Sequence, residues 1–263
     1  MRKLVLVVLF ITGLIAQAQT ADEIIDTYFE NIGGKEKIKA LKGMKMSAEI
    51  NQGVIIPLEI YKMKNGNEMV SISIQGMTLK QGVFDGETLW GTNQMTMKAE
   101  KMTAEETANH KLQAKDFPSP FLNYKDKGYT IELIGKETID GAEAFKIKLT
   151  QTPMTIEGKK VDNISYYFFD TENFVPIAVQ KEIMQGPGKG MVSEITFSDY
   201  QEVEGIYFAH AMTQGVKGKG GAAVTIKKIE VNPEVDASMF KFPEEIKKTE
   251  PVEEKIEIVA PRD

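Results

Sequence analysis

The sequence predicts a mainly antiparallel β fold, an open or closed barrel of about ten or eleven strands. Three observations support this prediction. Apolar and polar side chains alternate with a period of two from Met44 onward, short glycine-containing turns separate the alternating segments, and helical spacing occurs only near the N-terminus and once in mid-chain. No charged linker divides the chain, so we expect a single domain over residues 19–243.

The first eighteen residues have the pattern of a secretory signal peptide. Arg2 and Lys3 precede an apolar run, Leu4–Ala16, and small residues follow in Ala16-Gln17-Ala18. The run is about thirteen residues long, whereas a membrane-spanning helix needs about twenty. We therefore expect residues 1–18 to be removed after Ala18 and the remaining chain to work outside the cytoplasm, as a periplasmic protein. The alternative is an uncleaved N-terminal anchor.

The composition excludes several classes of function. Cysteine is absent, which rules out disulfides, thiol catalysis, thiolate metal sites and a lipidated N-terminal cysteine. The formal net charge is −6, and it becomes −8 without Arg2 and Lys3. An acidic chain argues against a nucleic-acid partner, which needs a basic face, and against simple electrostatic docking on anionic lipid. No second long apolar run follows the first, so we expect no transmembrane anchor.

The chain after the signal peptide is expected to begin with two helices. Thr20 and Glu23 have the spacing of a capping box, and an apolar stripe at helical spacing continues to Ile32. Gly33-Gly34 then ends the first helix. We expect a short second helix over Lys35–Leu41.

Short strands and tight turns then alternate in an antiparallel meander. The predicted strands of the first half are Met44–Ile50, Val54–Met63, Val70–Ile74, Thr78–Phe84 and Glu87–Trp90. Asn65-Gly66 and Asp85-Gly86 supply the positive φ angles that tight turns need. Methionine is abundant here, and its flexible thioether suits either core filling or a surface for variable apolar shapes. Six lie within forty residues: Met63, Met69, Met77, Met95, Met97 and Met102.

One helix-prone insert interrupts the meander. Thr103 and Glu106 form a second capping-box pattern, and helical spacing continues to about Lys115. Asn109-His110-Lys111 is expected on the solvated face of this helix. Two prolines in Phe117–Leu122 break regular structure. The insert is therefore expected to act either as a lid over one face of the sheet or as a plug that closes the core.

Strands resume at Tyr129 and continue to the end of the domain. The remaining predicted strands include Phe145–Leu149, Ile164–Phe169, Phe174–Met184, Met191–Tyr200, Ile206–Val216 and Ala222–Val231. Asp140-Gly141 and Glu204-Gly205 are typical of tight turns. Beyond Pro243 the chain is rich in Glu and Lys with interspersed prolines, so residues 244–263 are predicted to be a charged, flexible tail.

Motifs of the common enzyme classes are absent from the sequence. The two histidines, His110 and His210, belong to no HExxH or HxxEH pattern, and there is no Gly-x-Ser-x-Gly elbow. The glycine-rich stretch at residues 186–190 lacks the spacing of a phosphate-binding loop and is typical of a hairpin turn. We expect no enzyme activity, no cofactor and no metal site. A hydrolase site assembled across strands around His210 is a minor alternative.

Several segments together resemble one family of envelope proteins. The DGxTLW hairpin of the LolA family of periplasmic lipoprotein carriers resembles Phe84-Asp85-Gly86-Glu87-Thr88-Leu89-Trp90. A strand pair of the Bacteroidetes outer-membrane lipoprotein-sorting proteins is similar to Ser198-Asp199-Tyr200-Gln201-Glu202-Val203-Glu204-Gly205-Ile206-Tyr207-Phe208. The opening and the ending of that family are similar to residues 28–41 and 231–243. The resemblance spans residues 22–243.

The resemblance implies an incomplete barrel that holds acyl chains in an apolar hollow, with helices covering the opening. It implies a carrier or binder of lipidated cargo, either lipoprotein acyl chains or lipid, with an envelope protein as a candidate acceptor. The sequence departs from the family at the lid. LolA-type carriers latch the lid with an arginine on an early strand, and here no arginine lies between Arg2 and Arg262.

Eight apolar residues are predicted to line the hollow and its mouth. Five lie on early strands and three near the mouth: Met46, Ile60, Met69, Ile72 and Met77, then Trp90, Phe117 and Phe121. We expect the protein to be a monomer. The alternative is an envelope interaction module of the same fold, without lipid transport, whose interior is filled by bulky side chains. The candidates for such filling are Tyr166, Phe168, Phe197 and Phe208.

Overall fold

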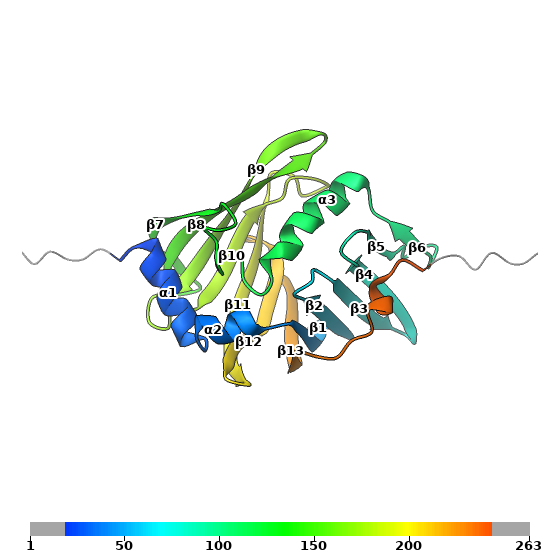
Figure 1. Ribbon diagram of the computed structural model, residues 1–263, viewed down its shortest axis with the longest axis horizontal. Coiled ribbons are helices and arrows are strands. Elements are labelled where there is room, and N and C mark those ends of the chain that lie inside the picture. The colour runs from blue at the N-terminus through cyan, green and yellow to red at the C-terminus, as the bar shows by residue number, and fades with distance from the viewer. Residues whose placement is uncertain (1–18, 244–263) are drawn as a thin grey trace, which may run out of the picture.

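The computed structural model describes residues 19–243, so the predicted signal peptide and the predicted C-terminal tail lie outside the described residues. Within this range, thirteen strands pair in one antiparallel sheet, in the order β6-β5-β4-β3-β2-β1-β13-β12-β11-β10-β9-β8-β7. The sheet curves but does not close, because its edge strands β6 and β7 are not paired with each other (Figure 1). The prediction of an incomplete, mainly antiparallel barrel is confirmed.

The elements follow the predicted order, but β8 and β9 extend well beyond the predicted strands Phe145–Leu149 and Ile164–Phe169. The helices are α1 (Ala21–Asn31), α2 (Lys35–Ala40) and α3 (Ala104–Gln113), with short 3-10 helices η1 (Ala114–Asp116) and η2 (Ala237–Phe240). The first six strands are β1 (Gly43–Asn51), β2 (Ile55–Met63), β3 (Glu68–Ile74), β4 (Met77–Phe84), β5 (Leu89–Thr92) and β6 (Ala99–Lys101). The other seven are β7 (Thr130–Ile139), β8 (Ala142–Ile156), β9 (Lys159–Asp170), β10 (Pro176–Glu182), β11 (Val192–Val203), β12 (Ile206–Val216) and β13 (Gly221–Val231).

Local sequence signals account for the ends of the helices. At α1, the Thr20 hydroxyl accepts a hydrogen bond from the Glu23 amide at 3.2 Å, and the Glu23 carboxylate accepts one from the Thr20 amide at 2.8 Å. This reciprocal pair satisfies amides that have no partner inside the helix. Thr103 and Glu106 form the same box at α3. Both predicted capping boxes are confirmed.

Two predicted turns set the register of long hairpins. Asp140-Gly141 and Glu204-Gly205 both have positive φ at each residue, at 46° and 88° and at 53° and 77°. Two such residues in succession form the tight turn whose twist matches that of the flanking strands. The short strand β6 was not predicted, because three residues are too few to show an alternating pattern.

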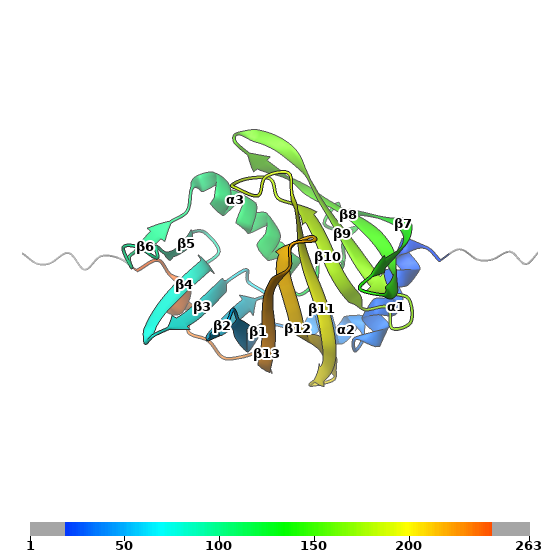
Figure 2. The ribbon, with the colours of Figure 1, turned by 180° about the vertical axis from the view of Figure 1, so that it is seen from behind.

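The sheet has two chemically different faces, which we call inner and outer. All three helices lie on the inner side, in front of the sheet in Figure 1 and behind it in Figure 2. Because side chains alternate across a strand, the cross-strand pairs assign each residue to one face. Phe145 and Phe169 pair on the inner face beneath α1, and Phe84 and Leu89 pair on the inner face beneath α3.

Residues 237–242 cover the outer face of β2, β4 and β5. Phe240 is fully buried against Trp90, Val83 and Tyr61. The Trp90 indole Nε1 donates a 2.9 Å hydrogen bond to the Phe240 carbonyl oxygen. This bond satisfies the polar atom of a buried tryptophan and fixes the path of the last described residues.

Candidate functional site

The candidate site is a run of apolar side chains on the inner face of five neighbouring strands. Met46 pairs with Ile60, which pairs with Val70, and the next rung consists of Ala48, Leu58 and Ile72. Strands β12 and β13 continue these rungs on the other side of β1. The surface that we call the apolar track comprises Met46, Ala48, Ile50, Leu58, Ile60, Val70, Ile72, Phe208, Met212, Val224, Ile226 and Ile229.

Most of the apolar track is only partly covered. Ala48, Leu58, Ile226 and Ile229 are buried, whereas the other eight side chains keep part of their surface exposed. Isolated apolar side chains on a protein surface are common, but a contiguous apolar surface of this kind marks a place where something binds. The track is therefore the region of the inner face suited to hydrocarbon.

The other half of the inner face is closed, and we call it the filled half. Here α1, α2 and residues 117–129 pack on β7, β8 and β9. Phe29, Ile147 and Phe169 are fully buried, and the Phe121 ring contacts the Phe169 ring edge to face at 5.5 Å between centroids. This half provides the hydrophobic core, and the pocket of about 290 Å³ between α1 and residues 121–126 is lined mostly by polar side chains.

Helix α3 joins the two halves. On one side of the helix, the Asn109 side chain forms two hydrogen bonds with the backbone of Thr155, at 2.6 Å and 2.9 Å. Glu105 accepts hydrogen bonds from the amides of Glu157 and Gly158, both at 2.9 Å. These contacts attach α3 to the tip of the β8–β9 hairpin and satisfy backbone groups of Thr155, Glu157 and Gly158.

The other side of α3 rests on β3 and on the β4–β5 hairpin. His110 Nε2 lies 3.4 Å from a Glu68 carboxylate oxygen, and its ring contacts Phe84 edge to face at 4.9 Å. Lys111 contacts Glu87 at 2.9 Å. The prediction that Asn109 and His110 face solvent is wrong, because Asn109 is buried and His110 is mostly covered. The sequence suggested that the polar triplet Asn109-His110-Lys111 is solvated. In the structure, however, its members contact Thr155, Glu68 and Glu87, respectively.

A polar rung separates the apolar track from the α3 side of the hollow. Lys62 and Glu68 pair on the inner face, one rung beyond Ile60 and Val70. Asp116 follows α3 and accepts hydrogen bonds from Tyr129 at 3.0 Å and from Gln151 at 2.6 Å. A pocket of about 220 Å³ lies between them, lined by Met44, Lys62, Glu68, Gln113, Asp116, Phe117, Pro118, Pro120, Gln151 and Tyr167. Its lining combines apolar and charged side chains, which suits the polar end of an amphiphile.

The ionisable groups of this rung are tuned by burial and by each other. Burial raises the pKa of Glu68, but His110 and Lys62 lower it by more, so the pKa lies below its ordinary value. Burial, together with the charge of Asp116, raises the pKa of Tyr129 to about 12. Glu68 is therefore ionised and Tyr129 is protonated at neutral pH. Both groups hold fixed charge states and do not act as proton relays.

Over residues 19–243 there is no group of three or more His, Cys, Asp or Glu side chains placed to hold a metal ion. The two histidines have separate partners, since His210 Nδ1 lies 2.9 Å from the Phe208 carbonyl oxygen while His110 contacts Glu68. The described helices are all too short or too polar to cross a bilayer.

The structure places the eight predicted residues in three different regions. Met46, Ile60 and Ile72 lie together on the apolar track. Met77 starts β4 at the far end of the same face, where it pairs with Ile74 and is 48% exposed. Met69 and Trp90 point to the outer face and pack with Phe240.

The two remaining residues, Phe117 and Phe121, belong to the filled half. They anchor the segment after α3 as a plug, which was one of the two expectations for the insert. Sequence reasoning did not assign the track residues on the C-terminal strands. Alternation in β12 and β13 contained that signal, in Phe208, Met212 and Val224, but the pairing of β13 with β1 is a long-range contact.

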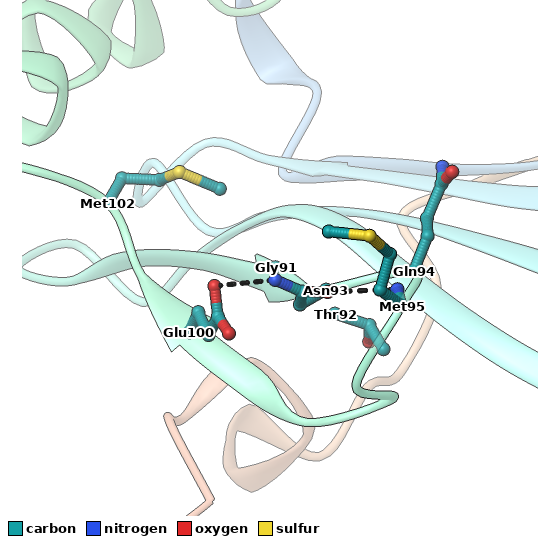
Figure 3. Close-up of a pocket in the computed structure, with 7 residues that line it drawn as sticks. All are labelled: Gly91, Thr92, Asn93, Gln94, Met95, Glu100 and Met102. Carbon is teal, nitrogen blue, oxygen red and sulfur yellow. Dashed lines mark hydrogen bonds between the residues drawn. The ribbon is translucent and has the colours of Figure 1, made fainter.

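Another pocket opens at the β5–β6 hairpin, on the edge of the sheet (Figure 3). It has a volume of about 360 Å³ and is lined by Gly91, Thr92, Asn93, Gln94, Met95, Glu100 and Met102. The Asn93 amide donates a 3.0 Å hydrogen bond to Glu100, and the Met95 backbone amide donates one to Asn93 at 2.9 Å. These bonds shape the turn itself. The pocket offers no second ionisable group beside Glu100.

Comparisons with known proteins support the fold. No family model matches the chain, and no curated protein matches it in sequence. Its structure is similar to that of a LolA superfamily protein from Nitrosomonas europaea, at a TM-score of 0.51 and 13% identity, covering 85% of this chain and 98% of that one. It is also similar to a domain from Vibrio parahaemolyticus assigned to outer membrane lipoprotein sorting, at a TM-score of 0.50 and 12% identity, covering 83% and 94%. The chain therefore has a LolA-like fold.

Proposed function

We propose that this protein is a non-enzymatic carrier or binder in the periplasm that shelters the acyl chains of lipidated cargo on the apolar track. The observation that carries the proposal is the contiguous, half-covered apolar surface on the inner face of β1, β2, β3, β12 and β13. It faces the same side as α3, so that bound hydrocarbon would lie between the sheet and this helix.

The energetics favour reversible binding without a covalent step. Each methylene group moved from water to an apolar surface contributes about 0.8 kcal/mol. An acyl chain that buries only part of its length against the apolar track therefore still binds measurably. The track residues are already held by their strands, so little ordering opposes binding. Release requires only a competing apolar site, such as an acceptor protein or a membrane.

Two independent lines support this proposal. The structural neighbours include a LolA superfamily protein and a domain assigned to outer membrane lipoprotein sorting. The N-terminal sequence has the pattern of a secretory signal peptide. Lipoprotein sorting toward the outer membrane is the specific role that we propose, with lipoprotein acyl chains as the cargo.

A second candidate function is an envelope interaction module that binds no lipid. The filled half favours it, because Phe29, Phe121 and Phe169 occupy the space on that side completely. Under this alternative the apolar track would be covered by a protein partner. The two candidates differ in one measurable property, the presence of hydrocarbon in the protein.

The experiment is to purify the protein without detergent and to identify extracted acyl lipids by mass spectrometry. The delipidated protein is then titrated with a fluorescent fatty acid. We expect co-purified lipid and saturable uptake of the probe. Absence of both would contradict the carrier function and favour the interaction module.

A matched pair of variants locates the binding site. Ile60→Asp places a carboxylate in the middle of the apolar track, and we expect it to weaken probe binding by about tenfold or more, because hydrocarbon cannot solvate the charge. Ile134→Asp is the control, since Ile134 is a half-exposed isoleucine on the edge strand β7. Both variants are first checked for an unchanged melting temperature. Equal loss in both would contradict the assignment of the site.

A further inference from the structure

Four neighbouring hairpin tips lie at the open end of the apolar track. Asn51 pairs with both Ile55 and Ala223, so the β1–β2 tip and the β12–β13 tip are side by side. The β3–β4 tip follows on one side, where Ile74 pairs with Met77, and the β10–β11 tip follows on the other, where Val192 pairs with Glu182. We call these four tips, residues 52–55, 75–77, 183–191 and 217–220, the tip edge.

The tip edge exposes large apolar side chains. Val54 is 65% exposed, Ile55 is 66% exposed and Met77 is 48% exposed. Adjacent apolar residues at a turn have no local structural role that would explain their exposure, since turns are ordinarily polar. They continue the apolar track outward, because Ile50 pairs with Ile56 in the last rung before the β1–β2 tip.

Lysines predominate among the ionisable residues of the tip edge. These are Lys189, Lys217 and Lys219. Lys189 lies 3.9 Å from Glu157 of the adjoining β8–β9 tip and Lys217 lies 3.9 Å from Glu137 on β7, but both pairs are largely exposed and so leave the lysines accessible. The turns at the opposite end carry mostly carboxylates. These are Asp85, Glu87, Glu172 and Glu204, with Lys64 as the basic member. Asp140 of the β7–β8 turn lies apart from them, since it lines a pocket together with Gly218 and Gly220 of the tip edge. The net negative charge of the chain therefore conceals a basic end.

We propose that the tip edge docks on the surface of an anionic lipid bilayer, with Val54, Ile55 and Met77 entering the interface and Lys189 and Lys219 facing lipid phosphates. This inference deepens the proposed function, since docking would open the apolar track directly onto the membrane that supplies or receives acyl chains. It also revises the expectation from net charge that the protein avoids anionic lipid.

The strength of docking follows from the electrostatic contribution of the lysines and the apolar contribution of the exposed side chains. A lysine near an anionic surface contributes about 1 kcal/mol, and this attraction falls off within a Debye length. Two or three exposed aliphatic side chains add a short-range apolar contribution. The sum describes weak, reversible and salt-sensitive binding, as a carrier that must leave the membrane requires. The acidic opposite end is repelled by the same surface and so orients the molecule.

The test is co-sedimentation of the full protein with vesicles of phosphatidylethanolamine and phosphatidylglycerol, compared with vesicles of phosphatidylcholine alone. We expect binding to the anionic vesicles that weakens with added salt, and little binding to phosphatidylcholine. The double variants Val54→Ser/Ile55→Ser and Lys189→Gln/Lys219→Gln are each expected to weaken binding to anionic vesicles by about tenfold.

Matched controls lie at the other end of the sheet. Lys42→Gln/Lys64→Gln removes the same charge there, and Tyr207→Ser removes a side chain that is 42% exposed on β12. Both controls are expected to keep wild-type binding. Equal binding to the two kinds of vesicle, or equal loss in the control variants, would overturn the proposal.

The uptake of a fluorescent fatty acid from solution separates this inference from the proposed function. Uptake without vesicle binding would overturn docking alone and would leave an acidic envelope protein as the occupant of the tip edge. Vesicle binding without uptake would overturn the carrier function alone.

Discussion

The two halves of the inner face use the same strand pattern and reach opposite results. In the filled half, Ile147 and Leu149 alternate with lysines and are fully buried beneath α1 and residues 117–129. On the apolar track, Met46 and Ile50 also alternate with polar residues but remain partly exposed. The difference does not lie in the strands. It lies in what covers them, because α1 and α2 reach only one half of the sheet.

The two regions therefore have different roles: the filled half stabilises the fold, and the apolar track is left open for binding. The filled half supplies a dense core, in which aromatic rings of α1, β9 and the segment after α3 interlock. The apolar track can therefore stay open without unfolding the sheet, because the core elsewhere and the C-terminal segment on the outer face of β2, β4 and β5 stabilise the fold.

Truncation in the two halves should have very different costs. Phe169 is fully buried between Tyr28 and Phe121, so we expect Phe169→Ala to lower the free energy of unfolding by about 3–5 kcal/mol. Ile72 is partly exposed on the track, and Ile72→Ala should cost about 1 kcal/mol or less. Urea unfolding measures both. A similar loss in the free energy of unfolding for the two variants would show that the apolar track is part of the core, and would contradict the distinction between the two halves.

The stability of the outer face behind the apolar track should depend on its contacts with residues 237–242. Trp90→Phe removes the hydrogen bond to the Phe240 carbonyl and leaves this acceptor buried. We expect a loss of about 1–3 kcal/mol in the free energy of unfolding. Hydrogen exchange should also quicken in residues 237–242. Unchanged exchange there would show that the segment is held by other contacts.

The connection between the halves should weaken when α3 loses its hold on β8. Asn109→Ala removes both hydrogen bonds to the Thr155 backbone, and we expect a loss of about 1–2 kcal/mol. Faster hydrogen exchange in α3, with unchanged exchange in α1, would show that α3 opens separately from the filled half. Lys115→Ala, at an exposed position directly after α3, is the matched control. If α1 and α3 exchange faster together, the two regions are one cooperative unit.

Acid should remove the stability that the ionised Glu68 carboxylate of the polar rung contributes. The pKa of Glu68 is lowered in the folded protein, so its charged form stabilises the fold above the unfolded-state pKa. That contribution is lost as the pH falls from about 5 through the folded-state pKa. We expect Glu68→Gln to flatten the decline of stability in this window. Unfolding titrations of both proteins from neutral pH to pH 3 measure the difference, and identical pH profiles would contradict the role of Glu68.

Much of the fold could be predicted from local sequence patterns. Thr20-Ala21-Asp22-Glu23 and Thr103-Ala104-Glu105-Glu106 marked the starts of two helices because capping is a contact between near neighbours. Asp140-Gly141 and Glu204-Gly205 marked hairpins for the same reason. The open, antiparallel sheet followed from these signals.

The candidate site could be predicted only in part, because it depends on contacts that are distant in sequence. Met69 and Ile72 were both predicted to line the hollow, but strand alternation places them on opposite faces: Met69 points toward Phe240 and Ile72 toward the track. No local pattern indicates which face Phe240 will cover. Likewise, Phe208 and Met212 join Met46 only because β13 pairs with β1.

The most direct test of the account is to map where hydrocarbon binds. A fatty acid that carries a photoreactive diazirine is bound to the delipidated protein and irradiated, and the labelled residues are identified by peptide mass spectrometry. We expect labels on β1, β2, β3, β12 and β13 at residues of the apolar track, and none on the filled half. Labels confined to other surfaces, or no labelling that an unmodified fatty acid can displace, would contradict the account.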